Sequence, residues 1–144
     1  MSAEADMAPK GFVVAIDGPA GVGKSSIAHR VADHLGYYFL NSGNFYRAIT
    51  RAVLAQGEDP EDPESVLRVA RMISLDVTDG HLYADGIDVE DQLHTDLIDR
   101  HVARHSAIVE LRSIVNERLR ALADGGLNIV CEGRDITTVV FPDA

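Results

Sequence analysis

The feature that most constrains the fold of this chain is a glycine-rich segment, Gly18-Pro19-Ala20-Gly21-Val22-Gly23-Lys24-Ser25. It fits the pattern G-x-x-x-x-G-K-[ST] at every fixed position. The apolar run Phe12–Ile16 precedes it and predicts a strand buried on both faces, as in a parallel sheet. Apolar residues at helical spacing follow as far as Leu35, where Gly36 is a typical stop signal. A strand, a glycine-rich turn and a helix in this order predict a loop whose backbone N–H groups and helix N-terminus surround a phosphate group.

The residues of this loop predict ATP and Mg²⁺ as its ligands. Lys24 is expected to bridge the β- and γ-phosphates of ATP, and the hydroxyl of Ser25 is expected to bind the metal ion. Asp17 and Glu132 are candidates for holding water on that ion; alternatively, Asp17 caps the turn and Glu132 is exposed to solvent at a strand end. The predicted ATP-binding residues are Gly18, Pro19, Ala20, Gly21, Val22, Gly23, Lys24, Ser25 and Ser26.

The next part of the chain predicts an α/β fold with a small insert. Tyr37–Leu40 is typical of a second strand, and after Asn41-Ser42-Gly43 a helix with a buried stripe extends to Val53. Two successive βα units predict a parallel sheet. Alternation with a period of two on both sides of Thr78-Asp79-Gly80 predicts an antiparallel hairpin.

Later segments complete this division. An acidic connector at 57–64 is followed by a short amphipathic helix, and a helical stretch begins at about Thr95 and ends at Gly125-Gly126. Asn128–Cys131 predicts a third buried strand, with Cys131 as a buried apolar filler. The predicted parts are a disordered tail at 1–10, a first part of the core at 11–73, a small α+β insert at 74–124, and a core strand and acceptor-site loop at 125–144.

The composition excludes several classes of protein. The 23 acidic and 13 basic residues give a formal net charge of −10, which excludes a generally basic nucleic-acid binder. No apolar stretch is long enough to span a membrane, and residues 1–10 lack the pattern of a signal peptide. The histidines, among them His29, His34 and His105, lack the spacing and partners of a metal site and predict surface or helix-packing roles. We therefore expect a soluble, cytoplasmic protein with no nucleic-acid or membrane partner.

Two arginines are candidates for holding a second phosphate group. Arg47 lies near the start of the helix that follows the second strand, and Arg134 follows the third strand. The carboxyl ends of parallel strands meet at one edge of a sheet, and a planar guanidinium group suits a pair of phosphate oxygens. The chain has no Asn-Lys-x-Asp motif, which argues against a GTPase. These residues favour a kinase that holds an acceptor phosphate near the γ-phosphate of ATP.

Taken together, the motifs resemble those of the bacterial cytidylate kinases, which transfer the γ-phosphate of ATP to CMP or dCMP. The resemblance runs nearly end to end. It rests on Ile16-Asp17-Gly18-Pro19, Gly21-Val22-Gly23-Lys24, Leu40-Asn41-Ser42-Gly43 with Tyr46-Arg47, Asp88-Val89, and Gly133-Arg134-Asp135 with Thr138-Val139-Val140-Phe141-Pro142-Asp143-Ala144. It implies a P-loop core of three layers around a parallel sheet, incomplete here, and a small α+β insert that binds the nucleoside monophosphate.

The resemblance also implies roles for single residues of the acceptor site. Ser42, Arg47 and Arg134 would hold the phosphate and ribose side of CMP, whereas Arg112 and Asp135 would hydrogen-bond the cytosine ring. The implied CMP-binding set is Ser42, Tyr46, Arg47, Arg112, Arg134 and Asp135, and the implied catalytic set is Lys24, Arg47 and Arg134.

The chain departs from the family pattern at three places. Asn41 replaces the usual aspartate before Ser42 and keeps a hydrogen-bonding side chain without its charge. Ala103 stands where the family commonly has a cytosine-contacting serine, and Ser106 is a candidate substitute one turn later. The chain stops at Ala144, before a further core strand, an arginine-bearing lid and a C-terminal helix of the family, so we expect an N-terminal fragment or a truncated product.

This third departure affects both association and activity. The family is usually monomeric, but the missing strand would leave an apolar edge along Phe12–Ile16, so we expect the chain to be marginally stable or to self-associate. Two other functions remain open: a nucleotide-binding fragment that transfers no phosphate, and a P-loop kinase for another small molecule. Arg112, Arg134 and Asp135 weigh against the second of these.

Overall fold

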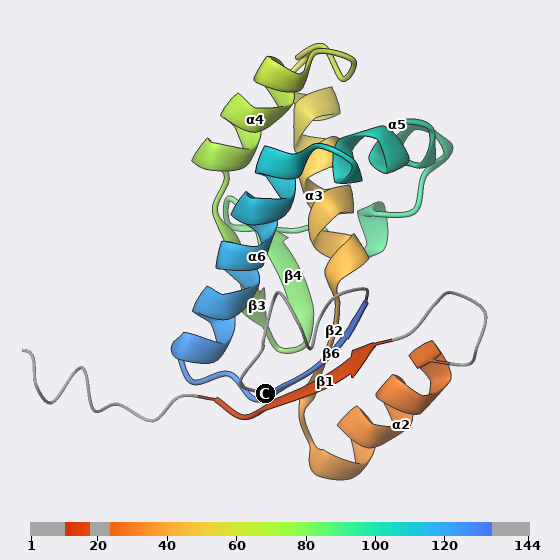
Figure 1. The fold of residues 1–144 in the computed structure, drawn as a ribbon, viewed down its shortest axis with the longest axis vertical. Coiled ribbons are helices and arrows are strands. Elements are labelled where there is room, and N and C mark those ends of the chain that lie inside the picture. Colours follow the sequence, from red (N-terminus) through yellow and green to blue (C-terminus); the bar gives the residue numbers. More distant parts are fainter. Residues whose placement is uncertain (1–10, 18–23, 134–144) are drawn as a thin grey trace, which may run out of the picture. The chain divides into compact units, whose positions relative to one another are not determined.

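The computed structural model describes residues 11–17 and 24–133, which belong to two compact units (Figure 1). The first unit contains the chain up to Asn41 and again from Leu119, and the second contains Ser42–Arg118. The boundary that the sequence predicts between residues 73 and 74 falls inside the second unit. The physical reason is that helix α3 (Ser42–Ala55) packs against both α4 (Pro63–Met72) and α5 (Asp96–Ser106), on either side of that boundary.

The first unit is built on a parallel sheet in the order β1 (Val13–Asp17), β6 (Ile129–Gly133), β2 (Tyr38–Asn41). Strand β6 is central, and its residues Ile129, Val130 and Cys131 are completely buried. Helix α2 (Lys24–Leu35) places Ala28 and Ala32 against Val130. The predicted α/β class, the parallel sheet and the buried position of Cys131 are thereby confirmed.

Strand β1 is less buried than its sequence predicts. Val13–Ile16 are half-buried, and Phe12 is 72% exposed. The prediction of a strand buried on both faces is therefore wrong within the described residues, because β6 and not β1 occupies the middle of this sheet. The apolar stripe of α2 is likewise narrower than predicted, since Ile27 and Leu35 are exposed.

The second unit packs α3, α4, α5 and the start of α6 (Val109–Asp124) with a small antiparallel sheet. The sheet has the order β3 (Leu75–Thr78), β4 (His81–Ala84), β5 (Ile87–Asp88), and a 3-10 turn at Glu90–Gln92 follows it. The fully buried large side chains of this unit include Phe45, Ile49, Leu82, Leu93 and Leu111.

The connector after α3 ends earlier than predicted. Helix α4 begins at Pro63, and Asp62 is its N-cap, with a side chain that accepts a hydrogen bond from the backbone N–H of Glu64. Proline suits the first helical position because its missing N–H would have no partner there. The predicted connector at 57–64 therefore includes the first residues of a helix.

Two Asp-Gly turns fix the small sheet. Asp79 and Gly80 have φ values of 52° and 77°, the positive pair that a two-residue hairpin turn requires, and the predicted hairpin is confirmed. Asp85 and Gly86 repeat this geometry, with φ values of 50° and 79°, and join β4 to β5. The helical stretch after Thr95 consists of two helices, α5 and α6. No helix in the described ranges has the length and apolar character needed to cross a membrane.

Candidate functional site

The framework of the predicted phosphate loop is present. Strand β1 ends at Asp17 and helix α2 begins at Lys24, so the glycine-rich segment joins a strand of the parallel sheet to a helix. Residues Gly18–Gly23 lie outside the described residues, as do the side chains of Asp17, Lys24, Ser25 and Ser26. The predicted acceptor residues Arg134 and Asp135 also lie outside them.

A buried carboxylate lies at the carboxyl ends of β6 and β2. Glu132 is only 6% exposed, and its Oε2 accepts a hydrogen bond of 3.3 Å from Nδ2 of Asn41, the residue opposite it in the sheet. The alternative of simple solvent exposure for Glu132 is therefore wrong, because the amide of β2 covers the carboxylate. On its other side, the register places Ile16 of β1 opposite Glu132, one residue before β1 ends.

This carboxylate fits the requirements of a magnesium ion held mainly by phosphates. Mg²⁺ takes oxygen ligands, keeps several waters, and is usually bound by one or two carboxylates together with substrate phosphates. Among the residues that the structure describes, no cluster of three or more His, Cys, Asp or Glu side chains forms a cage for a metal ion. Glu132 therefore suits contact with Mg²⁺ through water, which is one of the two roles that the sequence leaves open and stays a prediction.

The second unit carries the described residues of the predicted acceptor site on α3 and α6. Ser42 and Tyr46 are four residues apart at the start of α3 and so share one face of the helix. The guanidinium of Arg112, on α6, donates a hydrogen bond to the Tyr46 hydroxyl. Burial raises the pKa of Tyr46 above 10.0, and the neighbouring Arg112 charge partly opposes this shift. The structure thus brings together two residues that the resemblance assigns to the same ligand.

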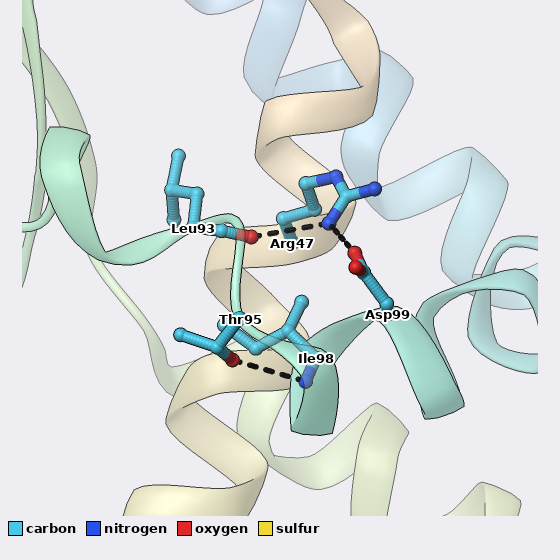
Figure 2. A network of polar contacts seen from close by, with 5 residues as sticks. All are labelled: Arg47, Leu93, Thr95, Ile98 and Asp99. Carbon is cyan, nitrogen blue, oxygen red and sulfur yellow. Dashed lines mark hydrogen bonds and ion pairs between the residues drawn. The ribbon is translucent and has the colours of Figure 1, made fainter.

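Arg47 lies at the centre of a polar network formed by α3, the first turn of α5 and the short segment just before α5 (Figure 2). Its Nη1 donates to the backbone oxygen of Leu93 at 3.1 Å and forms an ion pair of 2.5 Å with Oδ1 of Asp99. Leu93 is completely buried, whereas the side chain of Asp99 is 54% exposed. Thr95 caps α5 by accepting a hydrogen bond from the N–H of Ile98 at 3.2 Å, which orients the turn that carries Asp99.

Sequence reasoning missed Asp99. Its position in the first turn of α5 is typical of an acidic residue near a helix N-terminus and explains its presence without any partner. Arg47 and Asp99 are 52 positions apart, and no local pattern relates residues at that separation.

The candidate serine on α5 is engaged within its own helix. Ser106 donates its hydroxyl proton to the backbone oxygen of Ala103 at 3.0 Å, while Ala103 is exposed. The hydroxyl keeps only its lone pairs for another partner. The role of Ser106 as a substitute for a serine at position 103 stays a prediction.

His105 is a buried packing residue of the second unit. Its Nε2 lies 2.7 Å from the backbone oxygen of Pro60, and its Nδ1 lies 2.7 Å from Oγ1 of Thr50. A carbonyl oxygen only accepts, so Nε2 carries the proton and Nδ1 accepts from the threonine hydroxyl. Burial lowers the pKa of His105 below 6.5, and the hydrogen bond to Pro60 partly offsets this effect.

The family pattern that matches this chain and the known proteins similar to it agree on one family. The sequence pattern of the cytidylate kinase family matches residues 14–144. The chain is 41% identical over 131 residues to a cytidylate kinase of Caldanaerobacter subterraneus subsp. tengcongensis, covering 91% of this chain and 58% of that protein. It is 41% identical over 133 residues to a cytidylate kinase of Rhodopirellula baltica, covering 92% and 58%. It is 43% identical over 136 residues to a cytidylate kinase of Mycolicibacterium paratuberculosis, covering 92% and 60%. The chain thus spans about three-fifths of the length of these curated relatives.

Proposed function

The chain belongs to the cytidylate kinase family, and from this membership we propose that it transfers the γ-phosphate of ATP to CMP or dCMP, giving ADP and CDP or dCDP. The observation that carries the proposal is the phosphate-loop sequence between the end of β1 at Asp17 and the start of α2 at Lys24. Because the reaction consumes ATP, we assign this chain to the cytoplasm.

On the donor side, the loop residues from Gly18 to Ser26 bind ATP. Lys24 contacts the β- and γ-phosphates, and Ser25 contacts Mg²⁺, with Asp17 or Glu132 acting through water. The ion supplies neutralisation of the phosphate charge when it is bound. The buried position of Glu132 at the carboxyl end of β6 supports this assignment. The acidic total of the chain does not oppose it, because the local field of the loop sets phosphate affinity.

On the acceptor side, an oxygen of the CMP phosphate attacks the γ-phosphorus, and the bond from that phosphorus to the β,γ-bridging oxygen breaks as ADP leaves. The attacking oxygen is already ionised, so the step needs alignment and charge neutralisation more than a base. Arg47 and Arg134 hold the acceptor phosphate with Ser42, while Arg112, Tyr46 and Asp135 contact the nucleoside. The contact between Tyr46 and Arg112 supports this division.

A coupled ADP-release assay tests the proposal. The chain is incubated with ATP, Mg²⁺ and one acceptor at a time: CMP, dCMP, UMP, AMP or shikimate. The matched variants are Lys24→Ala and Lys10→Ala, because these are the two lysines of the chain and only one belongs to the loop. We expect turnover that requires CMP or dCMP, persists in Lys10→Ala, and falls by at least about 100-fold in Lys24→Ala.

Two other outcomes would contradict the proposal. ATP binding that depends on Lys24 without turnover on any acceptor identifies a nucleotide-binding chain that does not transfer phosphate. Turnover only with another acceptor identifies a different P-loop small-molecule kinase.

A further inference from the structure

One side of the Arg47 guanidinium is already engaged in the described chain. Both of its recorded contacts use Nη1, and within residues 11–17 and 24–133 no hydrogen bond uses Nε or Nη2. One Nη1 partner is the neutral carbonyl of buried Leu93, and the other is the carboxylate of Asp99. The first contact orients the guanidinium, whereas the second also neutralises its charge.

The two contacts differ in how easily an anion displaces them. The Leu93 carbonyl is part of a buried backbone, so its position is fixed by packing. Within the described residues the Asp99 carboxylate makes a single contact, from a side chain that is 54% exposed, and ion pairs of this kind stabilise a fold only weakly. A phosphate dianion carries more charge than a carboxylate and forms strong, charge-assisted hydrogen bonds with a guanidinium.

We propose that Asp99 is an internal competitor for the anionic acceptor at Arg47. In the free chain its carboxylate neutralises the guanidinium from Nη1, and the phosphate of the acceptor nucleotide competes with it for this charge, while the Leu93 carbonyl keeps the guanidinium oriented. Asp99 thereby sets the affinity for the acceptor. This inference rests on the proposed function, which assigns Arg47 to the acceptor phosphate.

Helix α5 is built to tolerate this release. Asp99 belongs to the first turn of α5, where the helix dipole favours a negative charge whether or not the ion pair is made. The cap from Thr95 to the N–H of Ile98 does not involve Asp99, so it does not depend on the ion pair (Figure 2).

The test compares Asp99→Asn with Asp96→Asn, which removes the same charge from the same helical turn. Asp96 is exposed, and no hydrogen bond or ion pair of its side chain is recorded in the described residues. Binding of CMP is measured by isothermal titration calorimetry at low and high salt. We expect a Kd about 2- to 5-fold lower for Asp99→Asn, the upper part of the range for removal of one exposed ion pair. We expect a change of less than about 2-fold for Asp96→Asn, since its charge is solvated, and smaller differences at high salt.

A variant at Arg47 separates this inference from the proposed function. Arg47→Gln should weaken CMP binding, and adding Asp99→Asn to it should then have no effect. If Arg47→Gln weakens binding but Asp99→Asn leaves the Kd unchanged or raises it, Asp99 only positions the arginine and the inference is wrong, while the proposed function stands. Equal tightening by Asp96→Asn and Asp99→Asn would also overturn the inference, in favour of long-range charge. If neither the unaltered chain nor Asp99→Asn binds CMP, the proposed function and the inference fail together.

Discussion

The amide of Asn41 allows one buried carboxylate to lie at the ends of β2 and β6. Its Nδ2 donates to Oε2 of Glu132, a residue that is 6% exposed. A carboxylate at position 41 would place a second negative charge beside the carboxylate of Glu132. Because Glu132 is buried, water would screen the repulsion between the two charges only weakly. Asparagine at position 41 therefore donates a hydrogen bond to Glu132 without adding a second negative charge to this edge of the sheet.

From this contact we predict that Asn41→Asp lowers the free energy of unfolding by about 1–3 kcal/mol at neutral pH without Mg²⁺, the range for losing a donor to a buried charged group. Urea denaturation at neutral pH measures the change. The matched control is Asn128→Asp, because Oδ1 of Asn128 accepts a hydrogen bond of 2.8 Å from the Phe12 N–H and an aspartate keeps that acceptor. Equal stability of the two variants would mean that Asn41 does not relieve the charge of Glu132.

His105 gives the second unit a pH-dependent stability whose sign follows from its buried environment. The pKa of His105 is lowered in the folded chain, mainly by burial, so between the folded value and the unfolded value of 6.5 the unfolded chain binds more protons. The free energy of unfolding therefore rises with pH in that range. The contribution of His105 to it is lost progressively as pH falls below 6.5. We predict that urea midpoints fall on acidification, and that His105→Gln flattens this dependence.

The effect of His81 on the pH dependence of stability has the opposite sign, so His81 must be replaced before the effect of His105 is measured. Hydrogen bonding to Asp88 raises the pKa of exposed His81, so its contribution is present at low pH and is lost as pH rises through the folded value. The effect of His105→Gln is therefore measured in a chain that already carries His81→Gln. A midpoint that depends on pH equally with and without the change at position 105 would contradict the role assigned to His105.

At the level of elements, Arg118 of α6 holds the end of α4. Its Nη1 donates to the backbone oxygen of Ile73 at 2.5 Å, and its Nη2 donates to those of Ala70 and Arg71 at 3.2 and 3.3 Å. The last carbonyls of a helix have no partner within the helix, so a guanidinium fork satisfies several of them at once. This contact joins two helices of the second unit that the sequence separates by a hairpin and a further helix.

We predict that Arg118→Met lowers the free energy of unfolding by about 1–3 kcal/mol, because it leaves carbonyl acceptors of α4 without their charged donor. Arg118→Lys should recover only part of this loss, since an ammonium group lacks the planar fork. Urea denaturation measures the stability of both variants, and we expect their m-values to equal that of the unaltered chain. A lysine variant as stable as the unaltered chain would show that charge alone, and not the fork, holds the helix end.

Elements were predictable where a local pattern carries the information. The hairpin follows from Asp79-Gly80, because two positive φ values require such residues, and the same signal at Asp85-Gly86 was available for the second turn. Strand β5 itself has only two residues, too few to show alternation. The burial of β1 was not predictable from its own residues, because burial depends on which strands lie beside it. For the same reason the ion pair of Arg47 with Asp99 required the structure, whereas the phosphate loop is readable as a fixed spacing.

At the scale of the whole molecule, the outer edge of β1 is the place where we expect a second copy of the chain to bind. The N–H of Ile129 donates to the oxygen of Phe12, so in this parallel pair the backbone groups of Phe12, Val14 and Ile16 face β6. Those of Val13 and Ala15 therefore face the other way. In the described residues β1 pairs with β6 alone, and an apolar strand with one open edge is a template for another chain.

We predict that the chain self-associates in a concentration-dependent manner and that Ala15→Pro suppresses this association while preserving the fold. Proline at position 15 removes an N–H that faces away from β6, which an edge strand tolerates. Val14→Pro is the control for the position of the proline, because it removes an N–H that faces β6 and should destabilise the sheet itself. Sedimentation velocity over a range of concentrations, together with thermal melts of each variant, separates the two effects. A monomeric chain that unfolds cooperatively at every concentration would show that this edge does not recruit a second copy, and that β1 is stable with β6 as its partner.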